Sequence, residues 1–457
     1  MEPVIDSTPP PAISSFGPLR ASAARFLNLR LSSHRGLAGI AAWSFLAAVI
    51  ARGSNLAAMI ICARTLAQDQ FGQIAIIQST VGTFAPVAGL GLAITTTKFM
   101  AEFRDTDPAR AGRVLALSLT AAAVAGLAMT GALILLAPSV ATWAFNSPAL
   151  SAQLIQASGL LALGVIESVQ TGALSGLEAF SRIARMSMWS GILSIPILGA
   201  LVWTRGVTGA IVGMTISLAL TCIFNAIALR AECRKWGIRP SLAGSAGEKH
   251  MLLHFSLPSY LSGVLVAPVT WLNTTLLVHR PGGLSELALF TAADRFRYLL
   301  IFLPVAVSRI AVPALARTRS VGDEQGYRDA FRWNVGFGLV STVPPALICL
   351  ALSVPPMGLF GESFKRGWPI MAVLAVSSIP TVMNTQLGAA LLSSGRAWER
   401  TAIDALLAGV FLLSAWLLIP RWNAAGLALA FALAYTAACV ALAICLRSSR
   451  DGALRTR

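Results

Sequence analysis

The chain has little charge for its length. Only 12% of its 457 residues are Asp, Glu, Lys or Arg, whereas a soluble protein carries about 25%. Among the charged residues the acidic ones are the scarcer, with 19 against 35 basic ones. The mean hydropathy is +0.72. A soluble globular fold needs more polar surface than this composition supplies, so that class is excluded.

Metal ligands and paired cysteines are also few. None of the six cysteines stands in a CxxC pair, and nearly all lie in apolar blocks, as is typical of free thiols. His250 and His254 stand four residues apart, but no third ligand is near them. No pattern of nucleophile and base occurs either. We therefore expect no metal, no cofactor and no enzymatic centre.

Long apolar blocks are present instead, and they predict an all-α polytopic membrane protein. A spanning helix needs about 20 apolar residues, and lipid accepts only helices or closed barrels. The blocks are too long for barrel strands. We count twelve spans, near residues 38–63, 71–95, 114–137, 151–174, 184–204, 207–229, 253–278, 284–311, 331–353, 368–392, 402–420 and 423–446.

The basic residues predict the orientation. With the N-terminus inside, the large majority of Lys and Arg falls on inner segments. Both termini are therefore expected in the cytoplasm of a bacterial inner-membrane protein. This bias also accounts for the net charge of +16 without nucleic acid, which we do not expect as a partner. The outer segments hold only Arg64, Arg205, Arg280, Lys365, Arg366 and Arg421.

Similar patterns in the two halves predict two parallel six-helix repeats. ALSGLEAFSR precedes the fifth span as LLSSGRAWER precedes the eleventh. Transporters commonly place their site between such halves, near the middle of the membrane. The expected segments are a disordered cytoplasmic tail 1–35, a first half 36–230, a cytoplasmic linker 231–252, a second half 253–447 and a cytoplasmic tail 448–457.

Four stretches carry a resemblance to a known family. They are ICARTLAQDQFG, FSLPSYLSGV, FTAADRFRYLLIFLPVAVSRIAVPALART and LFGESFKRGWPIMAVLAVSSIPTVMNTQLGAALLSSGR. These stretches resemble the oligosaccharide flippases of the multidrug/oligosaccharidyl-lipid/polysaccharide exporter superfamily. The resemblance covers about residues 36–447 and identifies the superfamily better than the substrate. One departure is Asn273, where many relatives have Asp.

The resemblance implies a V-shaped bundle with a central cavity between spans 1–6 and 7–12. It implies that the protein moves an undecaprenyl-diphosphate-linked oligosaccharide from the inner to the outer leaflet for exopolysaccharide, capsule or O-antigen assembly. The partners it implies are that substrate, the membrane lipids and the polysaccharide polymerase or export proteins. A multidrug/cation antiporter of the same superfamily is one alternative, and a membrane-embedded polymerase or glycosyltransferase is another.

The eighth span carries charges that an apolar helix does not need. On a helical wheel of about 100° per residue, one half is polar. Such a stripe faces protein or a water-filled cavity, which makes its members candidates for binding diphosphate or sugar. Arg297 and Asp294 could instead form a structural i, i+3 pair, and Asp294 is also a candidate for ion coupling. The stripe contains Asp294, Arg295, Arg297, Tyr298 and Arg309.

Two further spans add candidates. Arg52 lies near the middle of span 1, and Asn55 follows three residues later, so both are predicted to line the cavity. A snorkelling or structural arginine is the alternative for Arg52. Glu167 is the lone acid of span 4. It could carry a coupling proton or cation, or pair with an arginine of another helix.

Overall fold

The structure is a computed structural model that describes residues 35–244, 266–320, 323–352, 354–393 and 396–455. Its ordered elements are helices, and no strand occurs in these ranges, so the prediction of an all-helical fold is confirmed. The elements are α2 (Arg35–Thr65), α3 (Gln68–Gly89), α4 (Leu92–Phe103), α5 (Pro108–Trp143), α6 (Leu150–Ala157), α7 (Gly159–Gly176), α8 (Phe180–Lys235), α10 (Val266–Val278), α11 (Gly283–Ser320), α12 (Glu324–Ala351), α13 (Val354–Gly358), the 3-10 helix η2 (Glu362–Gly367), α14 (Trp368–Ser393) and α15 (Ala397–Arg455).

Seven of the described helical stretches are long and apolar enough to cross a membrane, and an eighth span arises if α3 and α4 form one bent span. The bend between them is 48° and falls at Leu90 and Gly91, which both have positive φ. Helix α10 is apolar but short, and residues 253–265 of its predicted span lie outside the described part of the chain. A multi-pass membrane protein is thus confirmed.

The two longest helices are each broken once. Helix α8, of 56 residues, has a non-helical Gly206 (φ 58, ψ −133), and α15, of 59 residues, has a non-helical Asn423 (φ 46, ψ −124). Three residues later each has a glycine that packs on the preceding segment. A Cβ at Gly209 or Gly426 would lie 1.8 or 2.3 Å from a carbonyl oxygen there, a contact that only glycine permits. The break at Gly206 lies between two of the predicted spans, and the break at Asn423 falls on the first residue of the predicted span 423–446.

The helices extend beyond the predicted spans. Helix α5 has 36 residues and is thus about 54 Å long, more than the apolar core of a bilayer requires. The second segment of α8 runs to Lys235, into the predicted linker 231–252. Hydropathy detects only the part of a helix that lies in lipid, so helices that continue beyond the lipid are longer than the predicted spans.

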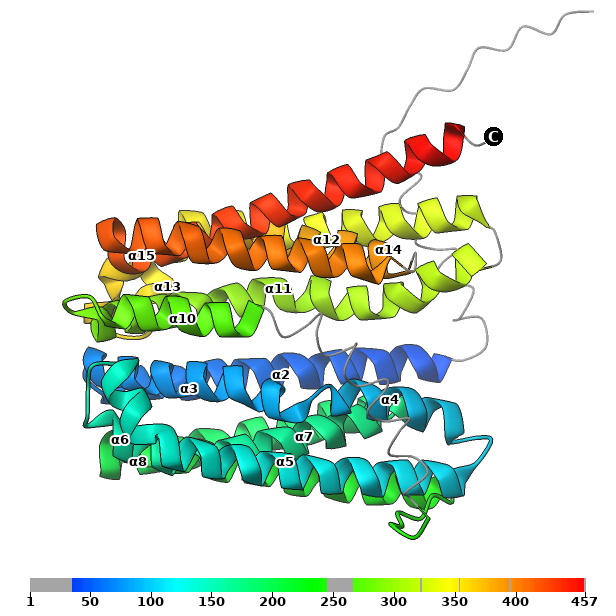
Figure 1. The fold of residues 1–457 in the computed structure, drawn as a ribbon, viewed down its shortest axis with the longest axis horizontal. Coiled ribbons are helices and arrows are strands. Elements are labelled where there is room, and N and C mark those ends of the chain that lie inside the picture. Colours follow the sequence, from blue (N-terminus) through cyan, green and yellow to red (C-terminus); the bar gives the residue numbers. More distant parts are fainter. Residues whose placement is uncertain (1–34, 245–265, 321–322, 353, 394–395, 456–457) are drawn as a thin grey trace, which may run out of the picture.

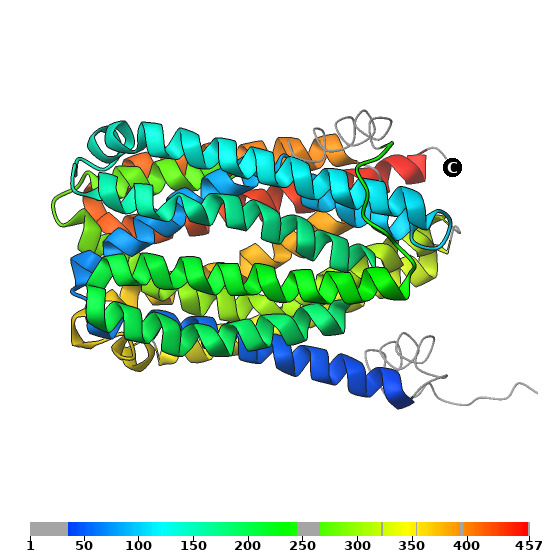
Figure 2. The same ribbon diagram turned by 90° about the horizontal axis from the view of Figure 1, so that it is seen from below.

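The chain divides into two layers. Helices α2–α8 form one layer, and α10–α15 form the other (Figure 1). Seen from below, the first layer lies in front and covers much of the second (Figure 2). Helix α3 of the first layer packs against α10 and α11 of the second. A buried apolar cluster that includes Phe71 and Phe411 runs through both layers.

The two layers are joined at the end that carries α6, α13 and η2, which we term the closed end (Figure 1). Arg64 Nε donates to the carbonyl oxygen of Leu359 at 2.7 Å. The ring of Phe71 meets that of Phe364 edge to face, with centroids 5.6 Å apart. At Gly72 a Cβ would lie 2.2 Å from a carbonyl oxygen of α11, so the backbones are in contact. These contacts hold the closed end together.

Candidate functional site

A pocket of about 180 Å³ lies between α2 and α11, one helix from each layer. Each helix contributes positions i, i+3 and i+4, which share one face. Arg52 is 13 residues before the end of α2 at Thr65, about 20 Å along the helix, which places it near the middle of a bilayer. The pocket is lined by Arg52, Asn55, Leu56, Arg295, Tyr298 and Leu299.

Four of the predicted site residues therefore meet in one place, although their role in binding stays a prediction. Arg52 and Asn55 are exposed to the pocket, and Tyr298 is 47% exposed. The Arg52 guanidinium lies over the ring of Phe302 on α11, 5.3 Å from its centroid. This attraction between a cation and an aromatic face links α2 of the first layer to α11 of the second.

Arg295 has a neutral partner. Its Nη2 donates to the Oε1 of Gln78 on α3, and its Nε is buried without a hydrogen-bond partner. The Nε2 of Gln78 in turn donates to the sulfur of Met214 at 3.2 Å. Among the described residues, no carboxylate forms an ion pair with Arg295. A guanidinium near mid-membrane whose charge no acid offsets attracts an anion.

Sequence reasoning did not identify Gln78 or Phe302. The sequence signal for Gln78 is its single amide side chain in the apolar stretch IAIIQST. A polar residue within a membrane span is energetically costly and therefore notable. Phe302 gave no signal, because an aromatic residue is ordinary in a spanning helix. Gln78 is recognised only when α3 lies beside α11, and Phe302 only when α2 lies beside α11.

Arg297 and Asp294 lie away from the pocket. Arg297 Nε donates to Asp294 Oδ1 at 2.5 Å, and the arginine side chain is only 6% exposed. The guanidinium also lies over the ring of Phe431 on α15, 4.4 Å from its centroid. This geometry is the structural i, i+3 pair that was one of the two interpretations. The side chain of Arg309 lies outside the described part of the structure.

Glu167 does not line the pocket either. It accepts a hydrogen bond from Thr171 Oγ1 at 2.8 Å, and Asn225 Nδ2 donates to the same hydroxyl at 3.3 Å. Within the described ranges no arginine or lysine lies in ion-pair distance of this carboxyl, so no pair with another helix is seen there. The ion-coupling role stays a prediction.

Metal ligands do not cluster in the described residues, where no group of three His, Cys, Asp or Glu side chains could hold an ion. His250 and His254 lie outside those residues.

With this fold and pocket, the chain belongs to the family described as polysaccharide biosynthesis protein, whose model matches residues 38–319. The family membership inferred from sequence resemblance is thus confirmed. The chain is 26% identical over 430 residues to the EPS I polysaccharide export inner membrane protein EpsE of Ralstonia nicotianae, covering 90% of this chain and 93% of that protein. The EpsE protein of Ralstonia solanacearum is 24% identical over the same shares.

Solved structures share the fold. An inward-facing multidrug resistance MATE family transporter of the MOP superfamily matches with a TM-score of 0.74 at 17% identity, covering 88% of this chain and 95% of that one. The lipid II flippase MurJ matches with a TM-score of 0.71 at 14% identity, covering 88% and 87%. A MOP superfamily transporter from Pyrococcus furiosus was reported for the reverse polarity of its binding pocket. It matches with a TM-score of 0.68 at 17% identity, covering 96% of this chain and 97% of that one.

Proposed function

We propose that the protein is a flippase that moves an undecaprenyl-diphosphate-linked oligosaccharide from the inner to the outer leaflet of the bacterial cytoplasmic membrane. One observation carries this proposal. Arg52 and Arg295, from the two layers, line a single mid-membrane pocket whose described lining includes no carboxylate. The family and the polysaccharide export role in the names of the EpsE relatives support the substrate class. The product would feed exopolysaccharide, capsule or O-antigen assembly.

The chemistry follows from the guanidinium group. A planar guanidinium donates two parallel hydrogen bonds to phosphate oxygens, which replaces part of the water that the diphosphate loses. The polyprenyl tail would stay in lipid while the charged head crosses between the layers. An inside-negative potential favours outward movement of an anion by about 2.3 kcal/mol per charge per 100 mV.

The proposal includes twelve spans in two six-helix repeats that form a V-shaped bundle around the central cavity. The matching breaks at Gly206 and Asn423 support it, because each divides one long helix into two spans. Both termini would be cytoplasmic, so the closed end would lie outside and the pocket would face the cytoplasm. Membrane lipids and polysaccharide polymerase or export proteins are the proposed partners, and nucleic acid is not.

A multidrug/cation antiporter is the second candidate, because MATE transporters share the fold and Glu167 is a membrane carboxyl without a described ion-pair partner. The pocket argues against it. A site for cationic drugs needs acids, whereas Arg52 and Arg295 make this pocket positive. A membrane-embedded polymerase or glycosyltransferase has less support, since the relatives are named for export.

Substitution of the two pocket arginines tests the function. Arg295→Lys keeps the charge but loses the bidentate hydrogen bonds to phosphate, so we expect export to fall in part. Arg295→Ala should lower export further. The double variant Arg52→Ala, Arg295→Ala should abolish surface polysaccharide at normal membrane abundance. Arg205→Ala, an exposed arginine outside the pocket, is the matched control. Full export of polysaccharide by a well-expressed double variant would reject the flippase proposal. So would efflux of a cationic dye by the native protein, if that efflux is lost in the double variant.

A further inference from the structure

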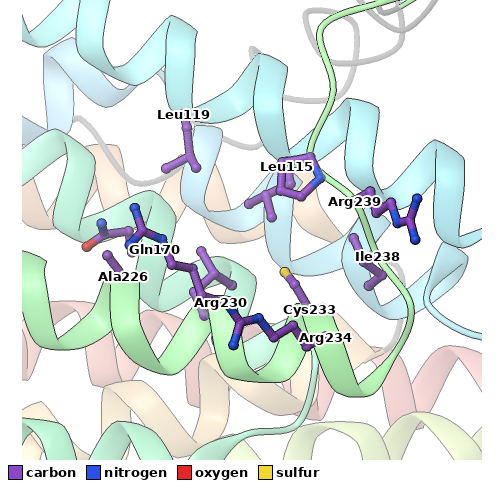
Figure 3. A pocket seen from close by; sticks show the side chains of 11 residues that line it. Leu115, Leu119, Gln170, Ala226, Arg230, Cys233, Arg234, Ile238 and Arg239 are labelled. Atoms are coloured by element: carbon purple, nitrogen blue, oxygen red, sulfur yellow. The ribbon is translucent and has the colours of Figure 1, made fainter.

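A second cavity, of about 380 Å³, lies within the first layer, between α5, α7, the last turns of α8 and the loop that follows α8 (Figure 3). Its volume is in the range of small-molecule sites, about 300–1,000 Å³. The inner part is apolar. It is lined there by Leu115, Leu119, Ala226, Leu229, Cys233 and Ile238.

The loop that closes this cavity is firmly placed. Ile238 N donates to the carbonyl oxygen of Cys233 at 2.8 Å, and Ser241 N donates to that of Gly112 on α5 at 3.4 Å. A Cβ at Gly112 would lie 2.1 Å from the carbonyl oxygen of Arg239. The loop backbone therefore rests directly on α5, and the cavity is a built feature of the fold.

Three arginines border the cavity, Arg230 and Arg234 on α8 and Arg239 on the loop (Figure 3). All three side chains are exposed. In the part of the chain that the structure describes, none of them forms an ion pair with a carboxylate, and the nearby Glu232 is bound by Arg182 at 2.7 Å. The border is thus a group of positive charges that no described acid offsets.

Gln170 supplies a polar group deeper inside. It is 7% exposed, lines the cavity, and its Oε1 is buried without a hydrogen-bond partner. Along α8, Ala226, Arg230 and Arg234 follow one another in steps of four residues, about 6 Å each, so an apolar and two basic positions share one face of the helix. An amide can present either its oxygen or its NH₂, and the NH₂ can donate to an ester carbonyl.

We propose that this cavity binds an anionic glycerophospholipid, with its head group at the arginine border, its ester region at Gln170 and an acyl chain among the leucines. The residues that line the cavity come from α5, α7, α8 and the loop after α8, all in the first layer, and none of them belongs to α10–α15. Basic pockets between membrane helices on the cytoplasmic side bind such head groups. The assignment to the cytoplasmic leaflet rests on the proposed topology.

The test is native mass spectrometry of the purified full chain titrated with dioleoyl-phosphatidylglycerol, beside dioleoyl-phosphatidylcholine and inorganic phosphate. We expect phosphatidylglycerol to bind preferentially. The triple variant Arg230→Ala, Arg234→Ala, Arg239→Ala should bind it about a hundredfold more weakly, at about fivefold per arginine. The charge-matched control is Arg185→Ala, Lys235→Ala, Arg332→Ala, which removes three exposed basic residues outside the cavity and should bind normally.

A second variant fills the apolar part without changing charge. Ala226→Trp should also weaken phosphatidylglycerol binding, and a monodisperse chromatographic peak establishes that it folds. Equal binding by the triple variant and its control would overturn the proposal. So would equal retention of both lipids by the native chain, or tight binding of inorganic phosphate alone. None of these results depends on polysaccharide export, so they leave the flippase proposal to its own test.

Discussion

Arg297 donates from its Nε to Asp294 Oδ1 at 2.5 Å, one turn earlier on α11, where the arginine side chain is only 6% exposed. Its guanidinium lies over Phe431, which belongs to α15. The pair thus fixes the contact between two helices of the second layer. Arg295, two residues away, turns to the opposite side of α11 and reaches the pocket. One helix therefore carries a buried pair on one face and an arginine without an acid on the other.

This relationship predicts a stability defect for Asp294→Asn. Removing one member of a buried ion pair leaves an uncompensated charge, which costs about 3–5 kcal/mol. We expect a lower melting midpoint in detergent and lower membrane abundance. The double variant Asp294→Leu, Arg297→Met removes both charges and should recover most of the loss. A normal melting midpoint together with lost ion dependence would instead assign Asp294 to ion coupling.

Gln78 is predicted to position Arg295. It holds the Nη2 of that arginine from α3, and Gln78→Leu removes the acceptor while keeping similar volume. We expect slower export with unchanged abundance, and a stronger dependence of export on substrate supply than in the native protein, because weaker binding leaves the pocket less saturated. Gln78→Glu would pair with the guanidinium and should lower export further, because it offsets the charge. Unchanged export by both variants would show that the contact has no role.

We predict that the closed end opens during transport. Ser285 Oγ donates to Asp69, so cysteines at these two positions would face each other across the closed end. We expect oxidation of Asp69→Cys, Ser285→Cys to stop export and a reductant to restore it, while each single variant responds to neither. Electrophoretic shift after proteolysis measures the extent of cross-linking. Normal export by fully cross-linked protein would contradict an opening at this end.

Glu167 is predicted to carry the coupling ion or proton. Its carboxyl has a described hydrogen bond from Thr171 and no described basic partner. Glu167→Gln should reduce export and abolish its response to an imposed ion or pH gradient, at normal abundance. Glu178→Gln, an exposed acid paired with Arg104, serves as control. A normal gradient response in Glu167→Gln would leave this residue structural.

The topology is open to direct measurement. Reporter fusions at positions 145 and 360, both near the closed end, should report the outside. Fusions at 105, 240, 322 and 398 should report the cytoplasm, because the adjoining segments hold most of the basic residues. An outside signal at 240 would contradict both the two-repeat arrangement and the assignment of the lipid cavity to the inner leaflet.

The sequence by itself determined the class of protein and most of its helices. Low charge and apolar blocks of bilayer length permit nothing but membrane helices. The break at Gly206 falls between two predicted spans and the break at Asn423 falls at the start of one, because the chain must turn there. The candidate arginines were also visible, since a charge in such a block is costly and therefore marks a site or a pair. Helix ends were placed less well, because polar turns beyond the lipid leave no hydropathy signal.

Only the tertiary structure decided which charge does which task. Helical periodicity gives the angles between Arg295 and Arg297 on one helix, about 200° apart, but not the rotation of that helix against its neighbours. That rotation is set by packing, with Phe431 on one side and Gln78 with Arg52 on the other. For the same reason the cavity at Arg230 was not foreseen: it forms where a loop rests on α5, and contacts between distant segments leave no periodic pattern in the sequence.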